Sequence, residues 1–445
     1  MIVFAHGIVG RADLPIPEAM FGAAAAAVLV LSFLALAGLW SRPRLQEWRE
    51  RRLLPFPVAA DVVVGALGVL VFVVTAYAGL AGTENERDNL APTVVYVALW
   101  VGVPFVSLFL GDVWRLISPW RAIGRASGRL MSRVTDPPEP LVYPARLGRW
   151  PAALGVAGFG ICELCWGTAR EPAPVAIIML VYLVVMLVGM SLYGVEAWTR
   201  NADPLGVYFS LFASLAPIAR HDGALYGRPP VVGAGRIDGS HGTAAVIITG
   251  LGVTAFDGAS EGPLFNDILP NLQDFFGGLG LNAEKALELG FVTGMLVAIG
   301  VIALIWSLAV RGMPAIDGRR PGAALVHSLV PILAAYVVAH YFSLFVYNGQ
   351  DLWRLGNDPL GKGSDLFGGA DAGIDYGVVS ATGIWYVQVC ALVVGHVAAL
   401  VLAHDRALEL YGSAKQATRS QVVMLVLMVA FTCLGLWLLS AALNA

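Results

Sequence analysis

The chain has 445 residues, of which 58% are hydrophobic and 13% are charged, and its mean hydropathy is +0.73. A water-soluble domain of this composition would need a largely apolar exterior, so the composition excludes that class and indicates a protein embedded in a lipid bilayer. The formal net charge of −3 gives no reason to expect a nucleic-acid partner.

The sequence predicts about ten membrane-spanning helices. A helix needs about 20 apolar residues to cross the ~30 Å hydrocarbon core, and runs of about this length recur along the chain. The fourth and sixth runs are near the lower limit of length for a membrane-spanning helix, and the fourth contains an acid, Glu163. The expected spans are 19–41, 60–82, 90–112, 150–166, 173–195, 239–256, 288–310, 322–347, 377–404 and 420–442. We therefore expect an all-α, polytopic helix bundle that forms a single transmembrane domain over residues 1–445.

The charges between these spans alternate in sign. Five segments hold 22 of the 28 Lys and Arg residues against 11 acids, and the other five hold 6 basic residues against 17 acids. The basic segments are 41–55, 111–150, 200–241, 311–321 and 405–420. Because basic loops stay in the cytoplasm, both termini are expected outside. Arg outnumbers Lys 25 to 3, which is typical of a GC-rich bacterial genome and suggests a bacterial plasma membrane.

Two further apolar segments are not expected to cross the membrane. Residues 204–219 lie between Arg200 and Arg220, which both belong to the cytoplasmic side, so we interpret this segment as an interfacial or re-entrant helix. Residues 264–279 carry apolar side chains at helical spacing, and the segment also contains the acids Asp267 and Asp274. This pattern predicts an amphipathic helix on the outer surface, acting as a lid or a brace.

Ionisable side chains at membrane depth are costly and often mark a functional site. Four of them are expected near the outer face: Glu163, Asp257, Glu261 and His340, the last about 27 Å from the inner end of its span at 1.5 Å per residue. Carboxylates with imidazole are the ligands of hydrolytic metal centres, so His340, Glu163 and Asp257 could hold a divalent metal. All four side chains are candidate catalytic acid–base groups, and His6 and Asp375 could join them.

Other interpretations of the outer site remain open. Ser260 is a weaker candidate nucleophile beside Glu261. Alternatively, Asp257 and Glu261 are exposed loop acids and His340 is a hydrogen-bonded packing residue. For Glu163, Arg170 lies two turns away if the helix continues, so we expect a partner from another span, with His340 as the candidate. The other possibility is that Glu163 reaches the outer interface and stays ionised in water.

A second, inner pair of side chains is His327 and His396, which lie at similar depths on neighbouring spans. Two facing histidines in a helical bundle could ligate haem, and structural hydrogen bonding is the alternative. Cys162 and Cys165 have the spacing of a redox pair but lie inside a span, which favours small buried residues.

Several stretches together resemble a family of actinobacterial membrane proteins that carries the name fenitrothion hydrolase. They include AHGIVGRADLPIP, ELCWGTAREPAP, YGVEAWTRNADPLGVYFSLF, TAFDGASEGP, AYVVAHYFSLFVYNGQ and DYGVVSATGIWYVQVCALVVGHVAALVLAHDRALELY. The likeness covers essentially the whole chain. The resemblance implies a multi-pass membrane protein, and the family name implies hydrolysis of an organophosphate triester.

We therefore expect a membrane-embedded hydrolase of a lipophilic ester with its site near the outer face. Its partners would be the lipid bilayer, a small lipophilic substrate and, in one reading, another membrane protein. Two other functional classes remain open. The first is a secondary transporter, because short and Gly/Pro-interrupted spans are typical of transporters. The second is a haem-bearing or accessory subunit of a respiratory membrane complex, with His327 and His396 as ligands.

Overall fold

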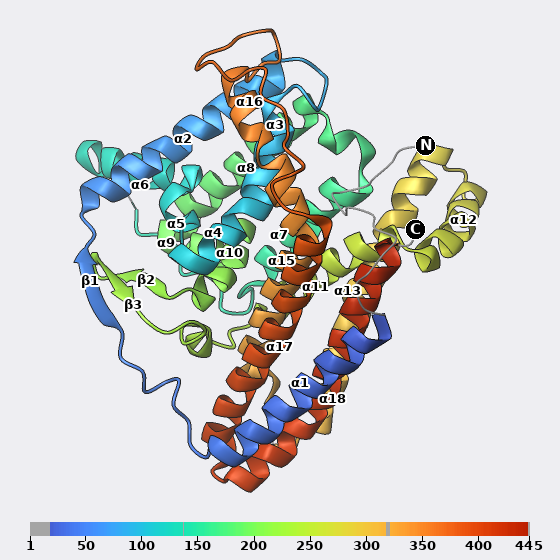
Figure 1. Cartoon of the computed structure of the whole chain (residues 1–445). Coiled ribbons are helices and arrows are strands. Elements are labelled where there is room, and N and C mark those ends of the chain that lie inside the picture. Colours follow the sequence, from blue (N-terminus) through green and yellow to red (C-terminus); the bar gives the residue numbers. More distant parts are fainter. Residues whose placement is uncertain (1–17, 137, 317–320, 444–445) are drawn as a thin grey trace. The chain divides into compact units, whose positions relative to one another are not determined.

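The computed structural model describes residues 18–136, 138–316 and 321–443 (Figure 1). Within them the chain is mainly helical, and eight helices are long and apolar enough to cross a membrane. The expected all-α, multi-pass architecture is thereby confirmed. Helices overlap all ten expected spans, and 420–442 lies within a helix of 30 residues. The chain divides into two compact units, unit 1 (1–49, 230–344 and 377–445) and unit 2 (50–229 and 345–376).

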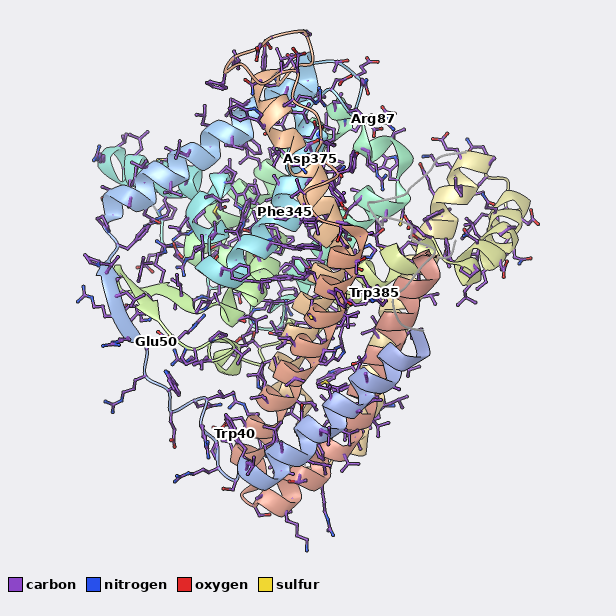
Figure 2. All side chains as sticks on the ribbon, in the orientation of Figure 1. Trp40, Glu50, Arg87, Phe345, Asp375 and Trp385 are labelled. Atoms are coloured by element: carbon purple, nitrogen blue, oxygen red, sulfur yellow. The ribbon has the colours of Figure 1, made fainter. Side chains whose placement is uncertain are left out.

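Unit 1 contains the first helix and most of the C-terminal half of the chain. Its elements are α1 (Glu18–Leu39), η4 (Ala234–Arg236), α11 (Thr243–Ser260), α12 (Pro263–Gly278), α13 (Ala283–Gly312), α14 (Gly322–Leu325), η5 (Val326–Leu329), α15 (Val330–Asn348), α17 (Ala381–Tyr411) and α18 (Ala414–Leu443). The last residues of α15 belong to unit 2. Helices α1, α17 and α18 lie side by side (Figure 1). Ala25, Ala335 and Leu392 join α1, α15 and α17 in one core, with Trp385 near the start of α17 (Figure 2).

Unit 2 combines spanning helices with shorter pieces. Its elements are β1 (Arg51–Pro55), α2 (Val58–Ala81), α3 (Leu90–Pro92), η1 (Thr93–Gly102), α4 (Val103–Leu110), α5 (Trp114–Ile117), α6 (Pro119–Val134), α7 (Trp150–Gly160), η2 (Ile161–Cys165), η3 (Gly167–Arg170), α8 (Pro172–Tyr193), α9 (Val195–Asn201), α10 (Pro204–Leu215), β2 (Ile218–His221), β3 (Ala224–Gly227) and α16 (Asp351–Asn357). Both η1 and η2 are π-helical. Such segments inside spanning helices are uncommon and are frequent at functional sites.

Two apolar helices are shorter than a full span. The helix over the fourth expected span, Trp150–Cys165, covers about 24 Å at 1.5 Å per residue. Helix α10, with 12 residues, covers about 18 Å, too little to cross the bilayer alone. Nine of its 12 residues are buried, so it lies inside unit 2 and not on a surface. This placement supports the re-entrant interpretation over the interfacial one.

The spans differ sharply in how much of their surface the protein covers. The windows of α1 and α2 are 17% buried, whereas those of α11 and of Gly322–Asn348 are each 72% buried. An apolar helix that exposes most of its side chains is suited to lipid contact, and a covered one is suited to carrying polar groups. Unit 1 therefore offers α11 and α15 as its interior helices.

Helix α12 covers the segment expected to be amphipathic. Phe265 is buried, whereas Leu264, Ile268, Phe275 and Leu279 are exposed along one stripe at helical spacing. The helix packs against α13. Its exposed apolar stripe agrees with the expected interfacial helix, and its role as a lid or a brace stays a prediction.

A small three-stranded sheet in unit 2 was not anticipated. Its order is β1-β3-β2, and both pairings are antiparallel. The β2–β3 hairpin turns at Asp222 and Gly223, which have φ angles of 48° and 67°. Positive φ at both central positions is the geometry that Asp-Gly favours. The Asp-Gly pair that favours this hairpin is therefore visible in the sequence, within a basic loop.

Contacts between loops agree with the sidedness that the charges predict. In unit 2, Glu50 forms an ion pair with Arg228 at 3.3 Å, joining two segments assigned to the cytoplasm. On the side assigned to the exterior, Arg354 forms an ion pair with Asp88 at 3.2 Å. In unit 1, Asp405 accepts hydrogen bonds from Trp40 Nε1 and from the backbone of the segment 41–55. Each contact joins segments that the charge pattern places on the same side of the membrane.

The predicted orientation can be tested by accessibility. Single cysteines at Ser41 and Ser132, both exposed, should resist an impermeant thiol reagent added outside intact cells, whereas a cysteine at exposed Asp371 should react. The background would be the chain with its four natural cysteines replaced by alanine. Reaction at Ser41→Cys or Ser132→Cys from outside would overturn the topology.

His221 in β2 should make the sheet region sensitive to pH. Burial alone would lower the pKa of His221, but hydrogen bonds to Asp222 and Glu50 and their negative charges raise it above its usual value. A raised folded-state pKa stabilises the folded chain fully below the unfolded pKa of about 6.5, and that stabilisation is lost as the pH rises through the folded value. His221→Gln should therefore lower the melting temperature near pH 5.5 and have little effect at pH 9. An equal effect at both pH values would contradict this ion pair.

Candidate functional site

The side chains of Asp257, His340 and Tyr341 meet inside unit 1. Nε2 of His340 lies 2.9 Å from Oδ2 of Asp257, and the Tyr341 hydroxyl donates to the same oxygen at 2.8 Å. The side chains of His340 and Asp257 are each only 5% exposed. Two of the four side chains expected at the outer site are thus in direct contact, and Asp257 is not an exposed loop acid.

Helices α11 and α15 hold this cluster through their own local sequence. Asp257 lies in the last turns of α11, beside Gly258, and a Cβ atom at Gly258 would lie 3.5 Å from Nδ1 and Cε1 of His340. One turn and a half earlier, a Cβ at Gly252 would come within 2.7 Å of the Ile299 backbone, so a small residue lets α11 pack directly on α13. Gly258 thus lies close to the imidazole that Asp257 binds.

This arrangement favours one chemical role for His340. An ionised carboxylate only accepts hydrogen bonds, so Asp257 accepts from the tyrosine hydroxyl and from Nε2–H of the imidazole. A proton fixed on Nε2 leaves the lone pair of Nδ1 available as a base. A carboxylate that orients an imidazole and stabilises its protonated form is the arrangement that general-base histidines use. Sequence reasoning missed Tyr341, although it directly follows His340.

The other two residues of the outer motif are arranged differently. Ser260 donates its single hydroxyl proton to the backbone carbonyl of Asp257 at 2.8 Å, so that proton is not directed at His340. The serine-nucleophile hypothesis gains no support from this contact. Glu261 is the C-cap of α11 and is partly exposed. It lies one turn from Asp257 on the same helix, and its acid–base role stays a prediction.

Glu163 belongs to unit 2 and is buried within the π-helical segment η2. The helix ends at Cys165, and the chain then turns through η3, so that Nε of Arg170 donates to the backbone carbonyl of Glu163 at 3.0 Å. The expectation that Arg170 lies two helical turns away was therefore wrong, because the helix does not continue. Burial also speaks against a Glu163 exposed to water. Because His340 belongs to unit 1, a partnership between the two stays a prediction.

The inner histidines are both buried in unit 1. Nδ1 of His396 lies 2.7 Å from the carbonyl oxygen of Leu392 in the preceding turn, and Nε2 of His396 has no hydrogen-bond partner among the described residues. A Cβ at the adjacent Gly395 would lie 2.3 Å from Cβ of Ala335, so α17 and α15 touch at this level. A porphyrin between these helices would have to separate them. The haem role of His327 and His396 stays a prediction that this packing does not favour.

A metal centre also stays a prediction. Among the described residues, no group of three or more His, Cys, Asp or Glu side chains could hold a metal ion. The structure supplies His340 and Asp257 as neighbours, and the third expected ligand, Glu163, lies in the other unit. His6 falls outside the described residues.

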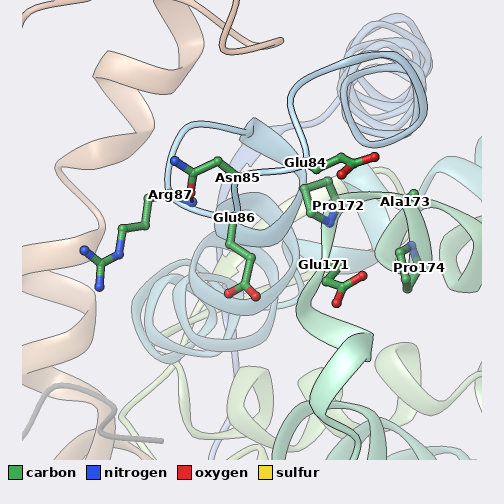
Figure 3. A pocket seen from close by; sticks show the side chains of 8 residues that line it. All are labelled: Glu84, Asn85, Glu86, Arg87, Glu171, Pro172, Ala173 and Pro174. Atoms are coloured by element: carbon green, nitrogen blue, oxygen red, sulfur yellow. Dashed lines mark hydrogen bonds between the residues drawn. The ribbon is translucent and has the colours of Figure 1, made fainter. Parts of the chain in front are cut away.

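Unit 2 contains hollows that the sequence did not indicate. One is an open acidic hollow of about 530 Å³ near the start of α8, lined by Glu84, Glu86 and Glu171 (Figure 3). A second is an apolar cavity of about 510 Å³, and a third is a basic pocket of about 190 Å³. These hollows bring together residues from several loops and spans, so periodicity along the chain carried no signal for them.

In comparisons with known proteins, no family model, no curated protein and no solved structure matches this chain.

The contribution of Tyr341 can be measured directly. Tyr341→Phe removes one donor from a buried carboxylate, so the free energy of unfolding should fall by about 1–3 kcal/mol. Thermal and denaturant unfolding of the detergent-solubilised protein measure this loss. The matched control is Tyr386→Phe on α17, at a side chain that is 49% exposed, which should change stability far less. Equal stability of the two variants would mean that the Tyr341–Asp257 contact contributes nothing.

Proposed function

We propose that this multi-pass protein lies in a bacterial plasma membrane and hydrolyses a lipophilic ester, with His340 as general base and Asp257 as the group that orients it. The observation that carries the proposal is the buried contact of 2.9 Å between His340 and Asp257 within membrane-spanning helices. Buried ionisable pairs at this depth are costly and persist where they serve a function. The resemblance to the family named fenitrothion hydrolase points to the same class of reaction.

The reaction would proceed by activation of water. Nδ1 of His340 takes a proton from a water molecule as its oxygen attacks the phosphorus or acyl carbon of the ester. The bond from that atom to the leaving alkoxide or phenoxide breaks, and the proton passes from the imidazolium to the leaving oxygen. Asp257 holds Nε2–H throughout and stabilises the positive charge on the ring. The products are an acid and an alcohol or phenol, and no further reactant is needed.

The membrane setting selects the class of substrate. An ester that partitions into the outer leaflet reaches spanning helices without first crossing water. An oriented general base contributes about 10²–10⁴-fold to such a reaction. A charged, water-soluble ester would have to be desolvated first, so we expect selectivity for neutral lipophilic esters.

The test uses the full-length protein in liposomes with a neutral nitrophenyl phosphotriester and a nitrophenyl carboxylic ester as probes. His340→Gln should lower turnover of the hydrolysed probe by about 10²-fold or more, and Asp257→Asn should also lower it strongly, because the imidazole loses its orienting carboxylate. Release of nitrophenolate measures the rate.

A matched control is His404→Gln, at a buried histidine of the same unit whose Nε2 lies 3.0 Å from the carbonyl oxygen of Trp40. This variant should retain activity if it folds. Wild-type protein that hydrolyses neither probe, or a His340→Gln variant as active as wild type, would reject the proposal.

A proton-coupled secondary transporter is the second candidate, and a specific observation favours it. The helix that carries His340 is preceded by a short α-helical turn and a 3₁₀ segment, α14 and η5, in place of a regular first half. Interrupted spans with buried titratable groups are typical of transporters. Uptake of the same neutral esters into liposomes, without hydrolysis and dependent on an imposed pH gradient and on His340, would favour transport over hydrolysis.

A further inference from the structure

The apolar cavity of unit 2 lies between spanning helices. Its walls come from α2, η1, α7 and α8, with Val71, Leu99, Phe159 and Met179 among its lining residues. Trp100 of the π-helical segment stacks on Phe159 at 4.1 Å and on Tyr208 at 5.0 Å, which makes one wall aromatic. The volume of about 510 Å³ is within the usual range for a small-molecule site, roughly 300–1,000 Å³.

Part of the cavity wall is exposed on a surface suited to lipid. Leu67 and Val71 of α2 line the cavity and are 55% and 53% exposed. Helix α2 is among the least buried of the spanning-length helices, and Asp61 in its first turn is its only charged residue. A hydrocarbon chain could therefore enter sideways from the bilayer without passing through water.

A basic pocket adjoins the cavity, since Trp114 lines both. Four arginines line this pocket: Arg115, Arg121, Arg149 and Arg200. Glu196 forms ion pairs with Arg115 at 2.7 Å and with Arg121 at 2.8 Å, so one carboxylate bridges two of the four cations. The Arg121 side chain is only 8% exposed, and its Nε–H has no hydrogen-bond partner among the described residues.

The acids of the pocket do not cancel this charge. Asp203 is buried and accepts hydrogen bonds from neutral donors, Trp120 at 2.9 Å and Tyr182 at 2.6 Å. Burial raises the pKa of Asp203, and those hydrogen bonds oppose the rise. Even with Asp112, Glu196 and Asp203 all ionised, four arginines against three acids leave a positive pocket. Asp203, Trp120 and Tyr182 form the layer where the basic pocket meets the apolar cavity.

We propose that these two hollows together form a binding site for an anionic phospholipid of the cytoplasmic leaflet. The phosphate would lie against Arg115, Arg121 and Arg200, and one acyl chain would occupy the cavity behind Trp114. The charge pattern assigns these arginines to the cytoplasmic side, where anionic lipid headgroups are found and basic pockets between spans bind them. The positive charge of the basic pocket is complementary to the phosphate of a phospholipid, and the apolar cavity is complementary to its acyl chain. All residues that line the two hollows belong to unit 2, and the proposal does not depend on the proposed hydrolysis.

Native mass spectrometry of the full-length, detergent-solubilised protein tests the site, with phosphatidylglycerol and phosphatidylcholine of identical acyl chains as probes. Wild type should retain phosphatidylglycerol preferentially. Arg115→Gln combined with Arg200→Gln, at two exposed side chains, should weaken phosphatidylglycerol binding on the order of tenfold. The matched control, Arg129→Gln with Arg133→Gln, removes two exposed arginines from α6 outside the pocket and should leave binding unchanged.

A second pair of variants tests the acyl chain separately. Gly158 lines the cavity, and a Cβ there meets nothing within 4 Å, so Gly158→Leu should fold, occupy cavity volume and weaken phosphatidylglycerol binding. Gly128→Leu, at an exposed helical glycine with equal free space, is its control. Equal retention of the two lipids would overturn the proposal. The proposal would also be overturned if millimolar glycerol phosphate displaced phosphatidylglycerol and Gly158→Leu had no effect on binding. That result would indicate a site for a phosphate group without a lipid.

Discussion

Polar groups at the depth of the hydrocarbon must find partners inside the protein, and the rest of this structure depends on that constraint. It explains why Asp257 and His340 lie on spans that are 72% buried, while the 17% buried windows of α1 and α2 carry almost only apolar side chains. In the loops, Glu50 pairs with Arg228 and Asp88 with Arg354, and each pair joins segments that the charge pattern assigns to one side of the membrane. The polar chemistry of the chain is therefore concentrated at a few buried contacts and at the two faces.

The regular parts of the fold could be predicted from the sequence because they follow from length and hydropathy. The contact between His340 and Asp257 was also predictable in outline, since both were expected at similar depth. Tyr341 and the return of Arg170 to Glu163 were missed because they depend on rotation about a helix and on a π-helical segment that ends early. The small sheet was missed because its Asp222–Gly223 turn lies in a basic loop, where hydropathy gives no signal for strands.

The two units use buried polarity in different ways. In unit 1 the buried polar side chains form a compact set, in which Asp257 accepts two hydrogen bonds and orients the His340 imidazole. Unit 2 arranges its buried polar side chains in a layer, in which Asp203 separates an apolar cavity from arginines. The first arrangement suits proton transfer to or from a bound molecule, and the second suits recognition of an amphiphile. Both units also contain helices that depart from regular geometry: the span that contains α15 begins with α14 and the 3₁₀ segment η5, and one wall of the cavity in unit 2 is the π-helical segment η1.

The state of the His340 ring tests the central claim most directly. Nitrogen-15 NMR of histidine-labelled full-length protein in micelles, with the signals assigned by comparison with His340→Gln, reports which ring nitrogen carries the proton. The account predicts a single tautomer near pH 8, protonated at Nε2 and bare at Nδ1, that is lost in Asp257→Asn. A His340 protonated at Nδ1 in the wild type, or a spectrum unchanged by Asp257→Asn, would contradict the assignment of this pair as an oriented base.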